Sequence, residues 1–132
     1  MAPFAPGFRL SVSDIVVIVL SCVVASLLTS LVWWWGLVPG FVVAHFFLFC
    51  NVLRMSRPLE LLWATVFLVL SGATIACGIP GWPITVVISL IVTAFVTVLE
   101  MRKPSYHGIG WTRINPGLPK WWASHVATRE SS

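Results

Sequence analysis

Charged side chains are scarce in this sequence: only 9% of its 132 residues are Asp, Glu, Lys or Arg, whereas an ordinary soluble domain carries about 25%. So few charges cannot cover the surface of a water-soluble globule of this length. The hydrophobic residues, 58% of the chain, fall in continuous blocks of membrane-spanning length and not in amphipathic stripes. The sequence therefore predicts an all-α membrane protein that has the lipid bilayer as its solvent.

Acidic residues are the scarcest charged group, with four in the whole chain. Three of them fall at the ends of apolar blocks and the fourth, Glu130, lies in the C-terminal tail. None therefore lies where the middle of a membrane would be. This disfavours a small proton-coupled drug transporter, which needs a midplane carboxylate, and it leaves little for hydrolytic or phosphotransfer chemistry. The acids Asp14, Glu60 and Glu100 are expected to form interfacial ion pairs with Arg9, Arg57 and Lys103, respectively.

Motifs for catalysis, metal binding and nucleic-acid binding are also lacking. Cys22, Cys50 and Cys77 form no CxxC pair and show no Cys/His spacing of a zinc site, so we expect small buried packing residues. No nucleophile, base and orienting acid stand in a recognisable arrangement, and no glycine loop for phosphate is present. We expect no enzymatic activity, no catalytic residues, no metal and no nucleic-acid partner.

Four apolar blocks are present, and they predict transmembrane helices at about residues 13–35, 39–54, 59–79 and 83–101. Ser11 and Asp14 offer N-cap chemistry for the first helix, and Pro58 suits the first turn of the third. Uncharged breakers at residues 36–40 and 78–83 reverse the chain, which gives two hairpins. The expected domains are a four-helix transmembrane domain, 1–103, and a short irregular tail, 104–132, in the cytoplasm or on the membrane surface.

The predicted second helix is short for a membrane span. Its roughly 16 residues cover about 24 Å, against a hydrocarbon core of about 30 Å. Either the bilayer thins locally, or part of residues 36–39 lies within the membrane behind neighbouring helices.

Basic residues occur on one side of this layout. The positive-inside rule therefore places both termini in the cytoplasm, and the asymmetry supports an even number of crossings. We expect the membrane to be the inner (cytoplasmic) membrane of a bacterium. The net charge of +4 is then explained by topology and not by nucleic-acid binding. The basic residues are Arg9, Arg54, Arg57, Arg102, Lys103, Arg113, Lys120 and Arg129.

Small and hydroxyl-bearing residues recur every four positions, which places them on one face of each helix. Because hydrophobic burial does not drive helices together in lipid, such faces favour helix packing, and pore lining is the alternative. The expected packing residues are Ser21, Ala25 and Thr29 in the first helix, Gly72 and Ala76 in the third, and Thr85, Ser89, Thr93 and Thr97 in the fourth.

His45 is the one ionisable residue well inside a predicted span. Three interpretations remain open: a neutral histidine bonded to a neighbouring helix, an axial ligand to a haem or chlorophyll-type pigment, and a proton-relay or substrate contact. The phenylalanines around it suit a flat macrocycle and ordinary packing equally. The identity of any cofactor stays unknown at this stage.

The tail is rich in tryptophan, and residues 119–130 are expected to form a short helix. Clustered Trp and basic side chains are typical of surfaces that contact a membrane or a partner protein. The expected contact residues are Trp111, Arg113, Lys120, Trp121 and Trp122.

Three functional classes follow. The leading one is an accessory or structural subunit of a larger membrane protein complex, whose partners are other membrane subunits. The alternatives are a small oligomeric channel or transporter, and a haem- or pigment-binding subunit that uses His45.

Overall fold

Helices joined by short connections make up the chain, and the computed structural model describes residues 4–131. Helix accounts for 76% of the protein, and no strand occurs in the described part. Three residues of the predicted 1–103 domain and one of the predicted tail lie outside it. The elements are α1 (Val12–Leu31), α2 (Trp33–Phe47), the π-helix η1 (Leu48–Val52), α3 (Arg57–Cys77), α4 (Trp82–Met101), α5 (Trp111–Ile114) and α6 (Leu118–Glu130).

Among residues 4–131, four helical segments are long and apolar enough to cross a membrane. Each has 20 or 21 residues, about 30 Å of helix, which matches the thickness of the hydrocarbon core. The prediction of an all-helical, multi-pass membrane protein is confirmed at this level. The four segments are Val12–Leu31, Trp33–Val52, Arg57–Cys77 and Trp82–Met101.

The first reversal of the chain is not where the sequence predicts it. Val32 alone separates two helices, with extended backbone angles of φ −143° and ψ 124°, and α2 starts at Trp33. The residues expected to form a breaker, 36–40, are helical and include Pro39 inside α2. Shifting the turn gives both spans 20 residues, which removes the length mismatch of the predicted second helix. The predicted bounds 13–35 and 39–54 are therefore wrong.

Local capping explains the start of α1 and both ends of α3. Ser11 is the N-cap of α1 and forms a capping box with Asp14, whose carboxylate accepts from the Ser11 backbone N–H at 2.8 Å. Pro58 lies in the first turn of α3, where its missing N–H costs no hydrogen bond. Gly78 ends α3 with φ +71°, a left-handed conformation that glycine adopts without a Cβ clash.

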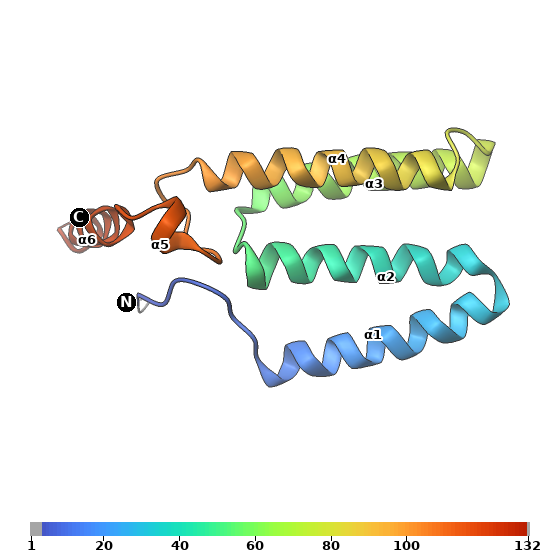
Figure 1. Ribbon diagram of the computed structural model, residues 1–132, viewed down its shortest axis with the longest axis horizontal. Helices are drawn as coiled ribbons and strands as arrows, with labels where there is room; N and C mark the ends of the chain where they lie inside the picture. The colour runs from blue at the N-terminus through green and yellow to red at the C-terminus, as the bar shows by residue number, and fades with distance from the viewer. Residues whose placement is uncertain (1–3, 132) are drawn as a thin grey trace.

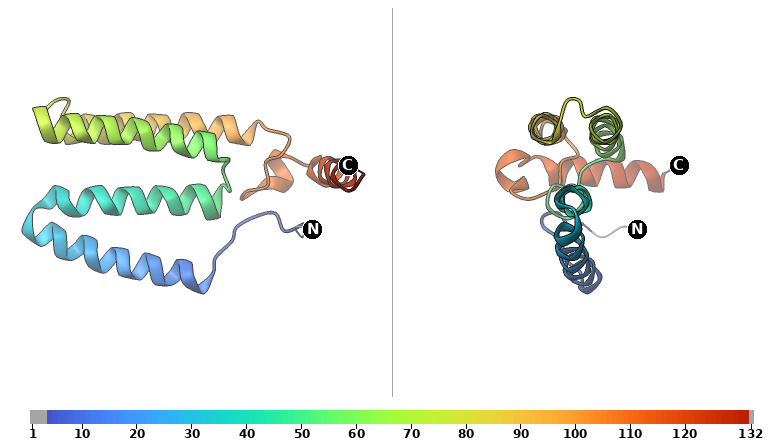
Figure 2. Two further views of the ribbon diagram at one scale, coloured as in Figure 1. Left: turned by 180° about the vertical axis from the view of Figure 1, so that it is seen from behind. Right: turned by 90° about the vertical axis from the view of Figure 1, so that its right-hand side faces the viewer.

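Three of the spanning helices, α2, α3 and α4, pack around a shared core, and α1 lies outside this group. Figure 1 shows α1 running along α2, and α3 running along α4. Seen along the helices, α1 lies beyond α2, on the side away from α3 and α4 (Figure 2, right). None of the residues of α1, all of which the structure describes, is buried.

Large side chains fill the space between α2, α3 and α4. The rings of Phe41 and Phe49 lie 5.9 and 5.5 Å from that of Trp63, so aromatic packing joins α2 and η1 to α3. At the opposite end of the molecule, Trp34 of α2 stacks on Trp82 of α4 with ring centroids 5.6 Å apart. The buried core consists of Phe49, Leu53, Met55, Trp63, Phe67 and Val96.

The N-terminal segment and the tail lie together at one end of the spanning helices (Figure 1). The tail contains α5 and α6, so the prediction that it is irregular is wrong, whereas its short helix is present. Figure 2 shows that α6 lies across this end, at a large angle to the spanning helices. The Gly7 N–H donates to the His107 carbonyl at 2.7 Å, and the Arg9 N–H donates to that of Asn51 at 3.0 Å.

Candidate functional site

The first predicted packing series lies against α2. A Cβ built on Gly36 would overlap Thr29 Oγ1 and the carbonyl oxygen of Ala25, so the two backbones are in direct contact there. One turn later, a Cβ on Gly40 would lie 3.7 Å from that of Ala25. Gly36 and Gly40 thus form a GxxxG face, a pattern that permits close approach of membrane helices. Ser21, the remaining predicted residue, is half-buried on the same side of α1.

The second predicted series lies between α4 and α3. Thr85 and Ser89 are completely buried, and the Thr85 hydroxyl is 2.9 Å from that of Thr74 on α3. The indole N–H of Trp63 donates to Thr93 Oγ1 at 2.9 Å and to the Ser89 carbonyl at 3.2 Å. Thr97, at the end of the series, is half-buried. The hydroxyls of Thr85, Ser89 and Thr93 are bonded within the helix pair.

Gly72 and Ala76 are placed differently from the other packing residues. Both are exposed, and no atom lies within 4 Å of a Cβ built on Gly72. The side of α3 that contacts this chain's own helices carries the buried residues Trp63, Phe67 and Thr74. The expected contact between Gly72 and another helix of the same chain is therefore absent among the described residues.

His45 lies in the aromatic packing between α2 and α3. Its side chain is 7% exposed, and its ring stacks on Trp63 with centroids 4.3 Å apart and planes 15° apart. Nδ1 is 2.8 Å from the Phe41 carbonyl oxygen, so Nδ1 carries the proton and the imidazole is bonded within its own helix. This geometry is that of a core histidine. Binding of a haem or pigment by His45 stays a prediction.

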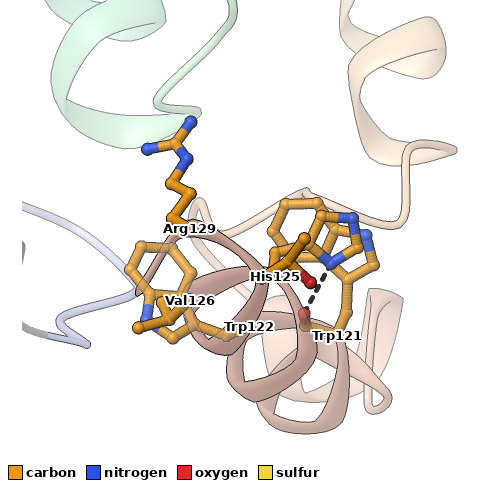
Figure 3. Close-up of a pocket in the computed structure, with 6 residues that line it drawn as sticks. Trp121, Trp122, His125, Val126 and Arg129 are labelled. Atoms are coloured by element: carbon orange, nitrogen blue, oxygen red, sulfur yellow. Dashed lines mark hydrogen bonds between the residues drawn. The ribbon is translucent and has the colours of Figure 1, made fainter. Parts of the chain in front are cut away.

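The tail tryptophans divide into two groups. Trp111 and Trp122 contact the ring of Phe4 edge to face at 5.9 and 5.5 Å, so both are engaged with the N-terminal segment. Trp121 stacks on His125 of the same helix at 4.0 Å. Figure 3 shows Trp121, Trp122 and His125 around a cavity of about 330 Å³ on α6. The predicted basic contact residues, Arg113 and Lys120, are exposed.

A polar cleft of about 490 Å³ opens at the same end of the molecule, where the spanning helices meet the tail. It brings together side chains from five segments, and the acids Glu60 and Glu100 both contribute to it. Its polar lining comes from η1 (Cys50), the connection to α3 (Arg54, Ser56), the start of α3 (Arg57, Glu60), the end of α4 (Glu100) and the tail (Ser105, His107). We refer to it as the polar cleft.

Glu60 and Glu100 are the buried charges of the polar cleft, with 6% and 3% of their surface exposed. Glu100 forms the expected ion pair, because Lys103 Nζ lies 2.9 Å from its Oε2. Ser56 completes this contact by donating to the same oxygen at 3.0 Å. Glu60 accepts a hydrogen bond from the Cys50 thiol at 3.5 Å.

The other two expected ion pairs are absent from the part of the chain that the structure describes. Glu60 lies in the polar cleft with Arg57 but makes no ion pair with it. Asp14 accepts from Ser11 and caps α1 instead of bonding to Arg9.

The three cysteines were expected to be buried packing residues, but Cys22, Cys50 and Cys77 are all exposed.

Arg54 lines the polar cleft, and Tyr106 lies in the chain between two residues that line it. A guanidinium N–H of Arg54 donates to the Ala5 carbonyl, which ties the N-terminal segment to the cleft. Burial, with the nearby charge of Arg9, lowers the pKa of Arg54; a guanidinium nevertheless stays charged at neutral pH. Tyr106 is completely buried and donates to the Ile109 carbonyl at 2.7 Å, and burial raises its pKa.

Sequence reasoning did not identify the polar cleft, because its residues come from segments far apart in the chain. The available signal was that Glu60 and Glu100 each lie next to a basic residue at a helix end on the same predicted side. The GxxxG face of α2 was also missed, since the same two glycines resemble a turn.

Comparisons with protein-family models, with curated proteins and with solved structures found no match to this chain. Within the described residues, no group of three or more His, Cys, Asp or Glu side chains could hold a metal ion. The functional interpretation therefore rests on the geometry of the chain itself.

Proposed function

We propose that this protein is a structural subunit of a larger membrane assembly. In this proposal α1 to α4 cross the bilayer as two hairpins, and the end that carries both termini faces the cytoplasm of a bacterial cell. All eight Lys and Arg residues belong to the segments at that end: the N-terminal segment, the connection before α3, the start of α3, the end of α4 and the tail. The positive-inside rule supports this orientation.

The outer face of α3 is the observation that carries the proposal. Gly72 and Ala76 stand one turn apart there, exposed, and open space surrounds Gly72. In membranes, pairs of small residues at this spacing allow a second helix to approach closely. We propose that a transmembrane helix of a partner protein packs on this face.

The peripheral position of α1 supports the same proposal. A four-helix protein that acts alone can close its helices into a bundle, whereas here α1 contacts α2 on one side and buries none of its described residues. The channel or transporter alternative depends on the hydroxyl series of α4, but Thr85, Ser89 and Thr93 are bonded within the α3–α4 pair. Their placement favours packing over a pore.

The test compares two substitutions that add the same side chain. Ala76 on α3 and Ala94 on α4 are both exposed, so Ala76→Leu fills the proposed contact face and Ala94→Leu adds equal bulk elsewhere. Native membranes are solubilised gently, and the size and composition of the complex are measured by native mass spectrometry. We expect Ala76→Leu to lower the fraction of chain in larger complexes about ten-fold, a loss of ~1.4 kcal/mol, and Ala94→Leu to leave it unchanged.

Two outcomes contradict the proposal. If the wild-type chain migrates alone, it is not a subunit. If it forms a homo-oligomer that transports solutes in liposomes, the transporter interpretation replaces the subunit interpretation.

A further inference from the structure

The polar cleft combines charges of both signs at the depth of the membrane interface. It lies where η1 ends, α3 begins and α4 ends, and these are the ends of three spanning segments. Lipid headgroups occupy this depth in a bilayer. Its volume of about 490 Å³ falls in the range of about 300–1,000 Å³ that small-molecule sites occupy.

Glu60 provides the negative part of this site. Its side chain is only 6% exposed, yet its hydrogen bond comes from a thiol, which is a weak donor. A buried carboxylate is costly unless strong donors or a cation satisfy it. Glu100, by contrast, is already paired with Lys103 and Ser56. Glu60 is thus the acid in the cleft that still has capacity for a cationic group.

Arg54 and Arg57 provide the positive part. A guanidinium carries five N–H donors, and Arg54 uses one on the Ala5 carbonyl, so it retains others. Arg57 is exposed and lines the cleft. Planar guanidinium groups are the preferred protein partners of phosphate oxygens, which they bind through two parallel hydrogen bonds.

We propose that the polar cleft binds a phosphoethanolamine group, with its phosphate on Arg54 and Arg57 and its primary ammonium on Glu60. A zwitterion suits the cleft better than a simple anion, because an anionic headgroup leaves the Glu60 carboxylate without a cation. It also suits the cleft better than phosphocholine, whose quaternary nitrogen has no N–H to donate. The two sources of this group are the headgroup of phosphatidylethanolamine and a soluble phosphoethanolamine ester.

Lipid binding to delipidated full-length protein in detergent tests the proposal. Native mass spectrometry gives dissociation constants for phosphatidylethanolamine, phosphatidylcholine and phosphatidylglycerol with identical acyl chains, and for glycerophosphoethanolamine. We expect phosphatidylethanolamine to bind at least ten-fold more tightly than the other two lipids, the size expected for a charge-assisted hydrogen bond. Tighter binding of the lipid than of glycerophosphoethanolamine identifies the membrane as the source, and equal binding identifies the soluble ester.

Substitutions separate the two halves of the site. Glu60→Gln should reduce the preference for phosphatidylethanolamine over phosphatidylcholine to about one. Arg57→Gln should weaken binding of both lipids alike, because both carry the phosphate. Asp14→Asn and Arg113→Gln remove the same charges outside the cleft and should leave the preference unchanged.

A second readout needs no change to the cleft. Cys50 is exposed and lines it, so in the Cys22→Ser/Cys77→Ser variant a bound headgroup should slow the reaction of Cys50 with a thiol reagent. Equal or tighter binding of phosphatidylglycerol overturns the proposal. An unchanged preference in Glu60→Gln, or no protection of Cys50 by phosphatidylethanolamine, overturns it as well.

Discussion

Gly36 lies at a close approach of α1 and α2. Its hydrogen atom faces Thr29 Oγ1 and the Ala25 carbonyl, and any larger side chain would overlap both. Because one of these atoms belongs to the backbone, a rotamer change cannot relieve the overlap. At this position the absence of a Cβ therefore determines the distance between two helices.

The first prediction at this scale concerns Gly36→Ala. The added methyl group should push α1 away from α2 and destabilise the fold by ~1–3 kcal/mol, the usual cost of overpacking. Thermal unfolding in detergent, followed by circular dichroism, measures the effect. Gly72→Ala is the matched control: nothing lies within 4 Å of its Cβ, so it should stabilise the helix by up to ~1 kcal/mol. Equal effects of the two changes would contradict the close contact.

Residue patterns predicted the capping of α1 but not the role of its neighbouring glycines. Ser11 followed by Asp14 indicates a helix start through local hydrogen bonds alone, so the sequence suffices. Gly36, Pro39 and Gly40 satisfy the chemistry of a turn as well as that of a packing face. Span length distinguishes these two interpretations, because a turn at residues 36–40 leaves the second helix too short to cross a bilayer.

Element α6 covers the end of the molecule and holds the N-terminal segment. Trp122 contacts Phe4 at 5.5 Å and His107 at 6.2 Å, while the neighbouring Trp121 stacks on His125 within α6. The two adjacent tryptophans of α6 therefore make different contacts, so substitutions at these two positions can be compared directly.

Trp122→Ala should loosen the N-terminal segment, whereas Trp121→Ala should not. An aromatic pair contributes about 0.5–1.5 kcal/mol beyond its buried area, so amide hydrogen exchange at Gly7, which donates to His107, should accelerate about 2- to 10-fold. Exchange of the N-terminal peptide, read by mass spectrometry, measures this. Equal protection in both variants would show that Phe4 is held by other contacts.

At the scale of elements, the sequence predicted four spans and a short tail helix, but it could not predict where α6 lies. Apolar blocks of span length define helices by composition, whatever their neighbours are. The position of α6 depends on contacts such as that between Trp122 and Phe4, which join opposite ends of the chain. The π-helix η1, whose Leu53 N–H donates to the Leu48 carbonyl at 2.9 Å, likewise has no composition signal.

For the whole molecule, the orientation in the membrane is the property to test. In a chain without its native cysteines, Ile79→Cys in the α3–α4 connection and Thr112→Cys in α5 introduce single exposed thiols. The α3–α4 connection and α5 lie at opposite ends of the spanning helices (Figure 1). In intact cells, a membrane-impermeant reagent should label position 79 and should spare position 112 until the cells are opened. Labelling of position 112 from outside would contradict the proposed cytoplasmic termini.

The arrangement of the whole molecule was the least predictable level. Small residues at four-residue spacing indicate that a helix face packs, but they do not say against what. The Thr85 face of α4 contacts α3, whereas the Gly72 face of α3 contacts no described helix of this chain. The same four-residue spacing of small residues thus occurs on a helix face that packs within the chain and on a helix face that is exposed.

The contacts of the first residues also have a consequence for biosynthesis. Gly7 and Phe4 emerge from the ribosome before the four spans, but they bind His107 and Trp122, which emerge after all four spans have been made. Because segments fold in the order in which their partners become available, the helices can enter the membrane before this end of the protein closes. The N-terminal segment therefore remains accessible to insertion factors throughout synthesis, and a chain truncated before α5 would insert fully yet leave that segment unsecured.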